Sequence, residues 1–451
     1  MTRKDFIKAI SAAGLASASA VQAKMRPDEQ EAHDSHKAYF VDTGIGLLDS
    51  EPLLQVPAED SVGVAFAVSG LAAGYAEVAD NAEMRNAVRF RSEGFPYAAA
   101  DPRILQVRMT GLRPATRYWY RVGAASIGRP IGYWVKQSAI EWGTVHSFVT
   151  CGTAAASHFA VITDTHGSRD AIRVVVRKLR EIAAPVTVWE GDVPPSLIDD
   201  EETAVKLYLK PLEEGPGFAA DAPCLFLDGN HDYRGQWNQR NPYRIMMARR
   251  EVERSLRDRL LARNFAIRQG AIAMIGLETG EDKPDCHPAH GGNAQFERFR
   301  TMQTAWLRDQ IARPEIASAP FIVAFCHIPL FDSRPDANPG TILENWADYQ
   351  KQCADEWGPI LSGCGAQLLV CGHKHRFRCD EANASRTWTQ IVGGGPELGY
   401  VGWGANTRPD PTRFPTVIEG KVEDGRLVVT AHDAWRGAVA LRRTFDARKQ
   451  G

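Results

Sequence analysis

The chain has 451 residues, of which 44% are hydrophobic and 24% are charged, as in an ordinary soluble globular protein. The formal net charge is -2, which argues against an extended basic surface for long nucleic acids, so we expect no nucleic-acid partner. At about 150 residues per domain, this length predicts two or three domains.

The first 23 residues have the pattern of an export signal. A basic head at Arg3 and Lys4 is followed by a weakly apolar stretch rich in Ala and Ser and by a small-residue cleavage site that ends at Ala23. The string TRKDFIK resembles a twin-arginine export signal, with Lys in place of the second Arg. We expect an exported protein, periplasmic or secreted, without an integral membrane segment once the signal is removed. Residues 24–36 are polar and highly charged, and we interpret them as a linker.

Residues 37–150 have the pattern of an all-β domain. Short alternating runs such as ILQVRMTGL at 104–112 and RYWYRVG at 117–123 are separated by turn signals. Such runs favour a β-sandwich. The segment VRMTGLRPATRYWYRVG resembles the fibronectin type III pattern, in which a Leu-x-Pro-x-Thr turn precedes a Tyr-x-Tyr strand.

From residue 157 to residue 437 the pattern changes to strands that alternate with helices. Continuous apolar runs predict buried strands at 158–164, 186–192, 224–230, 271–278, 321–327 and 367–373. Helical spacing of apolar residues predicts helices at 169–184, 296–312 and 343–362. This alternation indicates an α/β domain with a buried sheet. Near the end, 416–434 predicts a β-hairpin with an Asp424-Gly425 turn.

The chain contains 8 cysteines. An even number in an exported chain permits disulfides, but a chain of this length can bury an adequate core without them. Cys224, Cys326 and Cys371 lie inside apolar strand patterns, so we interpret them as buried free thiols. Pairing among the other five is left open.

Polar side chains follow almost every predicted strand of the second domain. Binding sites in α/β sheets form just beyond the carboxyl ends of the strands, so we expect these side chains to converge. Imidazole, carboxylate and amide oxygen suit borderline and hard metal ions, and the lack of a thiolate excludes a zinc site of the cysteine type. The residues concerned are Asp164, His166, Asp192, Asn230, His231, Asp232, His327, His373 and His375.

Two pairs of these residues, Asp164-x-His166 and His373-x-His375, are spaced by two. At a strand end this spacing predicts that both side chains lie on the same face, where they can hold a metal ion together. The ligand-capable groups are too many for one tetrahedral ion. Two ions that share a bridging carboxylate would use these seven groups well.

The order Asp-x-His, Gly-Asp, Gly-Asn-His-Asp, His, Gly-His-x-His resembles the calcineurin-like metallophosphoesterase superfamily, and the five blocks occur in this order across residues 160–376. The resemblance implies an α/β sandwich of mixed sheets flanked by helices, here preceded by the all-β sandwich. It implies two divalent or trivalent metal ions. The first would be held by Asp164, His166, Asp192 and His375. The second would be held by Asp192, Asn230, His327 and His373, with Asp192 bridging.

The resemblance also implies a mechanism. A hydroxide that bridges the two metal ions would attack the phosphorus of a small phosphomonoester or phosphodiester. His231 would donate a proton to the departing oxygen or stabilise it, and Asp232 would help to orient His231. Arg234, Arg240 and Arg244 follow this motif in a polar stretch, and they would either contact a substrate phosphate or simply face solvent.

The pairing of a fibronectin-like domain with these blocks, together with Gln303-x-x-Trp306-Leu307, resembles purple acid phosphatases and their bacterial relatives. Two departures matter, because those enzymes have Gly at the position of His166 and a tyrosine ligand at the position of Pro195. Without the tyrosinate we expect a colourless relative. The metal pair is open between iron, manganese, zinc and magnesium.

Other functions are compatible with the same pattern. One alternative is a non-catalytic binding or adhesion module that keeps the metal-site scaffold. Another is a nucleotide-specific or phospholipid-specific phosphatase, or a nuclease, on this scaffold. The oligomeric state is open. His146, His158 and His432 have no supporting spacing, and we interpret them as surface or loop histidines.

Overall fold

The structure is a computed structural model of the chain, and it describes residues 46–93, 98–131, 134–212, 219–241, 243–247, 261–335, 337–339, 347–396, 400–401 and 408–448. The predicted export signal and linker lie outside the described residues. Within the described part of the chain, no helix combines the length and the apolar character that a membrane crossing requires.

The N-terminal region is a β-sandwich. One layer holds β1 (Leu53–Gln55), β2 (Ser61–Ala67) and β6 (Ile104–Thr110). The other layer holds β3 (Ala72–Ala79), β4 (Val88–Arg91), β5 (Ala100–Asp101), β7 (Arg117–Ile131), β9 (Glu141–Trp142) and β10 (His146–Val149). Alternate residues such as Val64, Val107 and Tyr120 face inward and form a buried core. The likeness to fibronectin type III stays a prediction.

The turn before β7 is closed by a tyrosine. The hydroxyl of Tyr118 accepts a hydrogen bond of 3.0 Å from the backbone N–H of Arg113, five residues earlier. Tyrosine corners of this kind fix a strand entry in β-sandwiches. The far end of β7, from Ile127 to Ile131, pairs with β8 (Trp134–Gln137) as an antiparallel hairpin.

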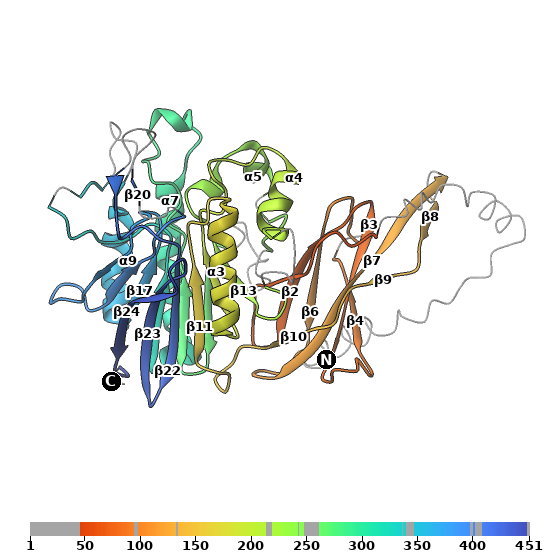
Figure 1. The fold of residues 1–451 in the computed structure, drawn as a ribbon, viewed down its shortest axis with the longest axis horizontal. Coiled ribbons are helices and arrows are strands. Elements are labelled where there is room, and N and C mark those ends of the chain that lie inside the picture. The colour runs from red at the N-terminus through yellow and green to blue at the C-terminus, as the bar shows by residue number, and fades with distance from the viewer. Residues whose placement is uncertain are drawn as a thin grey trace, which may run out of the picture. The chain divides into compact units, whose positions relative to one another are not determined.

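The second region contains two sheets packed face to face (Figure 1). In the first sheet, β11 (His158–Ile162), β12 (Thr187–Glu190) and β13 (Cys224–Leu227) run parallel, and β22 (Thr416–Glu423), β23 (Arg426–Asp433) and β24 (Ala438–Phe445) continue it antiparallel. The second sheet has the order β14 (Phe265–Gln269), β15 (Ile272–Gly276), β16 (Phe321–Phe325), β17 (Leu368–Cys371), β19 (Thr389–Val392) and β18 (Arg378–Asp380).

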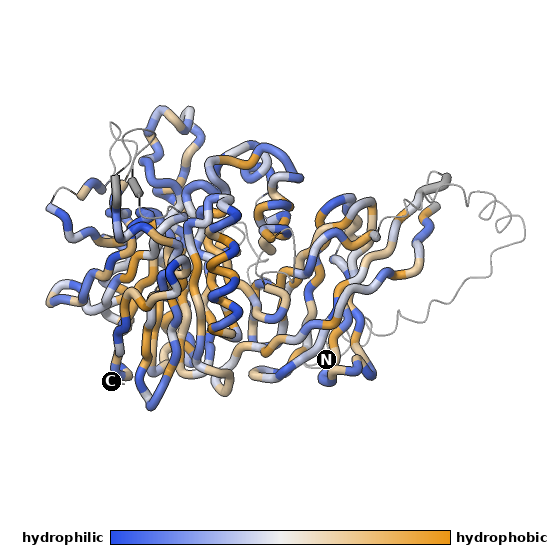
Figure 2. The backbone as a smooth tube through the Cα atoms, in the orientation of Figure 1, coloured by the Kyte–Doolittle hydropathy of each residue, from blue (hydrophilic) through white to orange (hydrophobic). Residues whose placement is uncertain are grey.

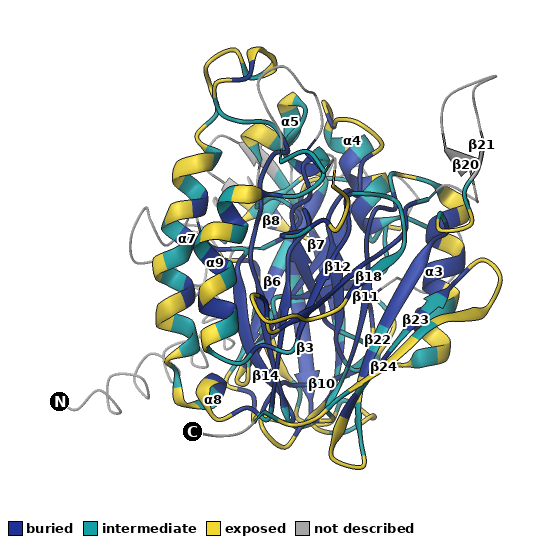
Figure 3. Ribbon diagram, turned by 90° about the vertical axis from the view of Figure 1, so that its left-hand side faces the viewer, coloured by how far each residue is buried: buried dark blue, intermediate teal, exposed yellow. Residues whose placement is uncertain are grey.

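Helices cover the outer face of each sheet. The first sheet carries α3 (Arg169–Ile182), α4 (Glu201–Ala204) and the π-helical turn η3 (Val205–Leu209). The second carries α7 (Phe296–Ile311), α8 (Pro314–Ala317) and α9 (Lys351–Gly363), and Figure 3 shows α7 and α9 side by side with their outer turns exposed. This arrangement confirms the predicted α/β sandwich of mixed sheets flanked by helices. The remaining short elements are η4 (His231–Tyr233), α5 (Gln236–Arg240), η6 (Pro288–His290), β20 (Tyr400–Val401) and β21 (Arg408–Pro409).

Helix α3 shows why the sequence forms these elements. The hydroxyl of Ser168 accepts a hydrogen bond from the N–H of Ala171 at the start, and Ala183 ends the helix in a left-handed conformation with a φ of 52°. Val175 and Leu179 are buried against the sheet. The prediction of this helix is confirmed to within two residues at its end. The helix predicted from residue 343 instead begins at Lys351, because residues 347–350 are not helical.

The predicted C-terminal hairpin is confirmed. Asp424 and Gly425, with φ values of 49° and 74°, join β22 to β23 in the left-handed conformations that a two-residue hairpin turn requires. In Figure 2 the hydrophobic colour concentrates in the central strands, whereas hairpin tips and outer loops are hydrophilic.

One sheet runs through both regions of the chain. Gln55 of β1 pairs in parallel register with Cys224 of β13, so the first sheet has the order β24-β23-β22-β11-β12-β13-β1-β2-β6. The N-terminal sandwich therefore continues the sheet of the second region through backbone hydrogen bonds. The sequence gives no sign of this pairing.

Candidate metal centre

The predicted ligands follow five strands from both sheets. Asp164, Asp192, His327 and His373 each lie two residues after the end of a strand, and Asn230 lies three residues after the end of β13. The strands end earlier than the apolar runs predicted, so the ligands occupy loops at the carboxyl edges of the two sheets. This edge is where α/β folds place their sites.

The loops hold these side chains in a backbone conformation that L-residues rarely adopt. Five candidate ligands have left-handed φ values: Asp164 (51°), His166 (44°), Asp192 (51°), His373 (71°) and His375 (52°). Each such residue costs about 1–3 kcal/mol, and such strain clusters at functional sites. Left-handed loops, rather than the alternation of an extended strand that we predicted, therefore bring Asp164 and His166 together. His373 and His375 do not act as a pair, because His375 groups with Asp164 and His166 whereas His373 groups with Asp192 and His327.

Two glycines allow the loops to approach one another. A Cβ added to Gly372 would collide with the hydroxyl of Thr163 and the carboxylate of Asp164. A Cβ on Gly229 would collide with the carboxylate of Asp192. The Gly-Asn-His-Asp and Gly-His-x-His motifs thus need glycine because ligands from neighbouring strands fill the space a side chain would take.

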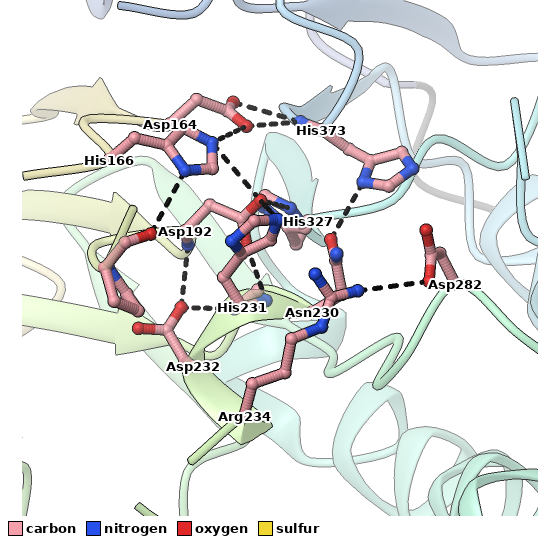
Figure 4. Close-up of polar contacts among 12 residues, drawn as sticks. Asp164, His166, Asp192, Asn230, His231, Asp232, Arg234, Asp282, His327 and His373 are labelled. Atoms are coloured by element: carbon pink, nitrogen blue, oxygen red, sulfur yellow. Dashed lines mark hydrogen bonds and ion pairs between the residues drawn. The ribbon is translucent and has the colours of Figure 1, made fainter. Parts of the chain in front are cut away.

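The side chains converge in two overlapping groups (Figure 4). The first group is Asp164, His166, Asp192 and His375, and the second is Asp192, His327 and His373. Within each group the ligand atoms lie within 4.8 Å of one another. Asp192 belongs to both groups, and the Oδ1 of Asn230 lies 2.9 Å from Nδ1 of His373. The structure thus brings together all seven residues that we predicted as ligands.

The nitrogen and oxygen atoms that face one another in these groups could hold a cation between them. Nε2 of His327 is buried without a hydrogen-bond partner and lies 3.2 Å from Oδ2 of Asp192. Nε2 of His166 and Nε2 of His375 face each other at 2.8 Å. Buried acceptor atoms aimed at one point are costly unless something positive satisfies them. Nitrogen and oxygen donors of this kind suit borderline or hard metal ions.

Backbone carbonyls orient three of the imidazoles. Nδ1 of His327 donates to the carbonyl of Glu190 at 2.7 Å, and Nδ1 of His166 donates to the carbonyl of Pro194 at 3.1 Å. Nε2 of His373 donates to the carbonyl of Ala347 at 3.0 Å. Each hydrogen bond fixes the tautomer, so the other ring nitrogen points its lone pair into the site.

The electrostatics of the group favour positive charge at its centre. Burial alone would raise the pKa of Asp192, but the neighbouring His327 and the other imidazoles hold it well below its usual range. Burial alone would lower the pKa of His327, but the carboxylate of Asp192 and then that of Asp164 raise it to about 10. The carboxylates therefore hold a proton at a position where a metal ion would supply the charge.

His231 lies at the rim of the group, with 21% of its side chain exposed. Its backbone N–H donates to Oδ1 of Asp192 at 2.8 Å, which fixes the residue beside the candidate ligand. Its Nε2 lies 4.0 Å from Oδ2 of Asp192, and its Nδ1 has no hydrogen-bond partner. Burial lowers the pKa of His231 to about 4, so the ring is neutral near pH 7 and offers one N–H and one lone pair.

The expected role of Asp232 needs correction. We expected Asp232 to orient the ring of His231. Oδ2 of Asp232 instead accepts hydrogen bonds from the N–H of Asp192 at 2.7 Å and the N–H of Gly229 at 2.8 Å. Its Oδ1 accepts one from the hydroxyl of Tyr208 at 2.6 Å. Asp232 therefore ties together the two loops that carry Asp192 and Asn230. Nothing in the sequence pointed to Tyr208 as its partner.

The other polar residues singled out from the sequence lie in different settings. Arg234 forms hydrogen bonds of 2.7 and 2.9 Å with Glu281 and one of 3.4 Å with Asp282, which Figure 4 shows. Arg244 is held by Glu201, whereas Arg240 is exposed on α5. His146, His158 and His432 are on strands and paired with carboxylates rather than on loops, which corrects our interpretation. Cys224, Cys326 and Cys371 are buried free thiols as predicted, and Cys286, Cys353, Cys364 and Cys379 are free as well.

Comparisons with known proteins agree with this fold. Residues 157–377 match a family described as calcineurin-like phosphoesterase. The chain is similar to a purple acid phosphatase from seeds of yellow lupin (Lupinus luteus), with 12% identity over 88% of this chain and 74% of that one, and a TM-score of 0.58. At this identity the likeness shows the fold alone.

Two further solved structures are similar to part of the chain. One is GAP50, the anchor in the inner membrane complex of Plasmodium, with 13% identity over 66% of this chain and 90% of that one, and a TM-score of 0.44. The other is Yfce, a phosphoesterase from E. coli, with 12% identity over 64% of this chain and all (100%) of that one, and a TM-score of 0.30. No curated protein matches the chain.

Proposed function

Because residues 157–377 belong to the calcineurin-like phosphoesterase family, we propose that the protein hydrolyses phosphate esters at a pair of metal ions. The observation that carries this proposal is the convergence of two ligand groups that share Asp192. The proposed substrates are small phosphomonoesters or phosphodiesters. The proposed place of action is outside the cytoplasm, on the strength of the N-terminal signal pattern.

The residues divide between two ions. Asp164, His166, Asp192 and His375 would hold the first, and Asp192, Asn230, His327 and His373 would hold the second. When bound, the pair supplies Lewis-acid chemistry, which neutralises charge on the phosphoryl group and lowers the pKa of water. Iron, manganese, zinc and magnesium are all compatible with these donors. Pro195 stands where a phenolate ligand would give colour, so we propose a colourless protein.

The chain's own residues would assist the leaving group and hold the metal ligands in place. His231 lies at the rim, where its N–H can donate a hydrogen bond to the oxygen that leaves phosphorus. Asp232 holds the loops of Asp192 and Asn230 in register through its three hydrogen bonds. The carbonyls of Glu190, Pro194 and Ala347 keep the imidazoles turned inward. No covalent attachment to the protein is required, because water is the nucleophile.

Turnover of two chromogenic substrates tests the proposal. The purified full chain is stripped of metal, reloaded with iron, manganese, zinc or magnesium, and assayed with p-nitrophenyl phosphate and bis-p-nitrophenyl phosphate. We expect hydrolysis of at least one substrate, together with metal bound at a ratio near two ions per chain. Tight metal binding without hydrolysis of either ester would contradict the enzyme and favour a binding or adhesion module.

Export is tested separately. Cells that express the full chain are fractionated, and the mass of the recovered protein is measured. Recovery outside the cytoplasm with loss of the residues up to Ala23 would support export. An intact N-terminus in the cytoplasmic fraction would contradict it.

A further inference from the structure

Tyr208 is a buried residue of the π-helical turn η3, outside the sequence motifs of the candidate metal centre. The turn directly continues α4, and the backbone N–H of Lys210 donates a hydrogen bond of 2.9 Å to the carbonyl of Val205, five residues earlier. Single turns of π-helix are rare and frequently occur at functional sites. The contacts of Tyr208 lead from this turn to the loops of the candidate metal centre.

The ring of Tyr208 packs against the two strands that lead to these loops. Its centroid lies 6.2 Å from the ring of Trp189 on β12 and 5.9 Å from the ring of Phe226 on β13. Trp189 and Phe226 are partners in the register of the two strands, and their own rings lie 6.2 Å apart. Tilted and edge-to-face aromatic pairs at this separation attract one another. The three rings therefore fix η3 against the strands that end before Asp192 and Asn230.

The hydroxyl of Tyr208 reaches the carboxylate that joins the two loops. It donates a hydrogen bond of 2.6 Å to Oδ1 of Asp232, whose Oδ2 accepts from the N–H groups of Asp192 and Gly229. Burial and then the carboxylate of Asp232 raise the pKa of Tyr208 well above its usual value, so the hydroxyl keeps its proton and acts as the donor. Both oxygens of Asp232 are thus engaged. A rotation of this carboxylate would break hydrogen bonds at each of them.

The two loops lie in direct contact beside Asp232. A Cβ added to Gly191 would collide with the backbone of Gly229, and a Cβ added to Gly229 would collide with the carboxylate of Asp192. The N–H of His231 donates to Oδ1 of Asp192 at 2.8 Å. The shared candidate ligand is therefore held at its side chain by one loop and at its backbone by Asp232. Any shift of Asp232 would move Asp192 with it.

We propose that Tyr208 is a positioning residue of the candidate metal centre. Its hydroxyl holds Asp232 in the orientation that keeps Asp192 at the point shared by both ligand groups. The inference rests on the proposed pair of metal ions and concerns how this chain holds them. Groups that orient metal ligands without binding the ion commonly change metal affinity by about 10–100-fold. Tyr208 therefore sets the metal affinity of the site without contacting the substrate.

Hydrogen exchange of the metal-free full chain tests the positioning directly. The test variant is Tyr208→Phe, which keeps the ring and removes only the hydroxyl. The matched control is Tyr120→Phe, because Tyr120 is also buried and its hydroxyl donates to the carbonyl of Ala220 at 2.7 Å. We expect exchange at the amides of Asp192 and Gly229 to become about tenfold faster in the test variant and to stay unchanged in the control. The melting temperatures of the two variants should fall by similar amounts, because each loses one buried hydrogen bond.

Zinc binding tests the consequence for the metal centre. The metal-free wild type and both variants are titrated with Zn²⁺ in a calorimeter. We expect Tyr208→Phe to bind zinc about tenfold more weakly and Tyr120→Phe to bind it like the wild type. Asp232→Ala should weaken binding at least as much, and the addition of Tyr208→Phe to it should cause no further loss, because Tyr208 acts through Asp232. If Asp232→Ala does not fold, the two tyrosine variants still decide the outcome.

Unchanged exchange and zinc affinity in Tyr208→Phe would overturn the proposal. Equal changes in Tyr120→Phe would overturn it as well, since the effect would then follow from the loss of any buried hydroxyl. Additive losses in the double variant would show that Tyr208 does not act through Asp232. Neither measurement depends on catalysis, and turnover of p-nitrophenyl phosphate is measured separately. The lack of hydrolysis by the metal-loaded wild type would contradict the proposed function, whereas the exchange and zinc results would still decide the role of Tyr208.

Discussion

The two ends of strand β11 carry similar residues with different consequences. Beyond its carboxyl end, the histidines and carboxylates of the candidate metal centre face one another, and Nε2 of His327 is buried without a hydrogen-bond partner. At its amino end, His158 and His432 each bond to the carboxylate of Glu419, at 2.8 Å and 3.3 Å. The difference is in the backbone: Glu419 and its partners lie on regular strands, whereas the candidate ligands lie in left-handed loops. Residue type alone therefore does not make a metal site.

Burial separates the two groups as well. The side chains of His158 and Glu419 keep 13% and 21% of their surface exposed, so water shares in their solvation. Asp192 and His327 keep 2% and 0%. Among the described residues, the groups able to hold a metal ion are the two at the carboxyl edge. A histidine–carboxylate cluster thus becomes a candidate metal site when its loops bury it and turn several ligand atoms toward one point.

Asp192→Asn gives the largest expected effect, because it removes the charge shared by both ligand groups. We expect loss of bound metal, measured by mass spectrometry of the dissolved protein, and a fall in kcat/KM of about a thousandfold. The matched control is Asp355→Asn on α9, whose side chain is 62% exposed, and it should change neither quantity. Full metal content in Asp192→Asn would contradict the contrast between the two ends of β11, because the carboxylate of Asp192, like that of Glu419, would then not be needed to hold a metal ion.

His231→Asn should reduce kcat about a hundredfold and leave metal content unchanged, because this residue lies at the rim rather than among the ligand atoms. The loss should be smaller for p-nitrophenyl phosphate than for an alkyl phosphate, since a good leaving group needs less help from a donor. A purely structural residue would show no such dependence on the leaving group. Equal losses for both substrates, or a loss of metal, would contradict the assigned role.

Gly372→Ala tests whether close loop approach distinguishes the carboxyl edge. The added methyl group collides with Thr163 and Asp164, so we expect a loss of about 1–3 kcal/mol in the free energy of unfolding, measured in urea. Gly363→Ala at the end of α9 is the control, because a Cβ there meets nothing within 4 Å. It should be neutral or stabilise the protein by about 0.5 kcal/mol. The same result for both variants would contradict the packing argument.

Glu419→Gln gives the smallest expected effect. Hydrogen bonds from His158 and then from His432 lower the pKa of Glu419 to about 2, from an ordinary value of 4.5. Because the folded pKa is depressed, the carboxylate stabilises the fold above pH 4.5, and this stabilisation is lost as the pH falls toward about 2. Glu419→Gln should therefore cost about 1 kcal/mol near pH 6 and progressively less toward pH 2, measured by denaturation at each pH. Any loss of bound metal in this variant would show that the cluster of Glu419 at the amino end of β11 and the candidate metal centre at its carboxyl end are not independent.

The sequence predicted the strands and helices of the second region well, because apolar periodicity follows from the faces that each element buries. It also named the side chains that the structure brings together at the candidate metal centre, because metal chemistry restricts the residue types. The backbone conformation of the site has no comparable signal in the sequence. The site depends on left-handed backbone conformations at Asp164 and His373 and on backbone carbonyls that orient the imidazoles. These are main-chain features, and residue type does not reveal them. The partners of Asp232 were missed because Tyr208 lies 24 residues away on a segment with no metal-site motif.

The parallel pairing of β1 with β13 has a practical consequence for dissection of the protein. A chain cut between the sandwich and the second region would leave β13 as a bare edge with unpaired backbone N–H and carbonyl groups. Such an edge recruits strands from other molecules, so the shortened protein should precipitate even though the loops of its candidate metal centre are complete. The N-terminal sandwich thus covers the edge of β13 through β1, and the second region is best expressed together with it.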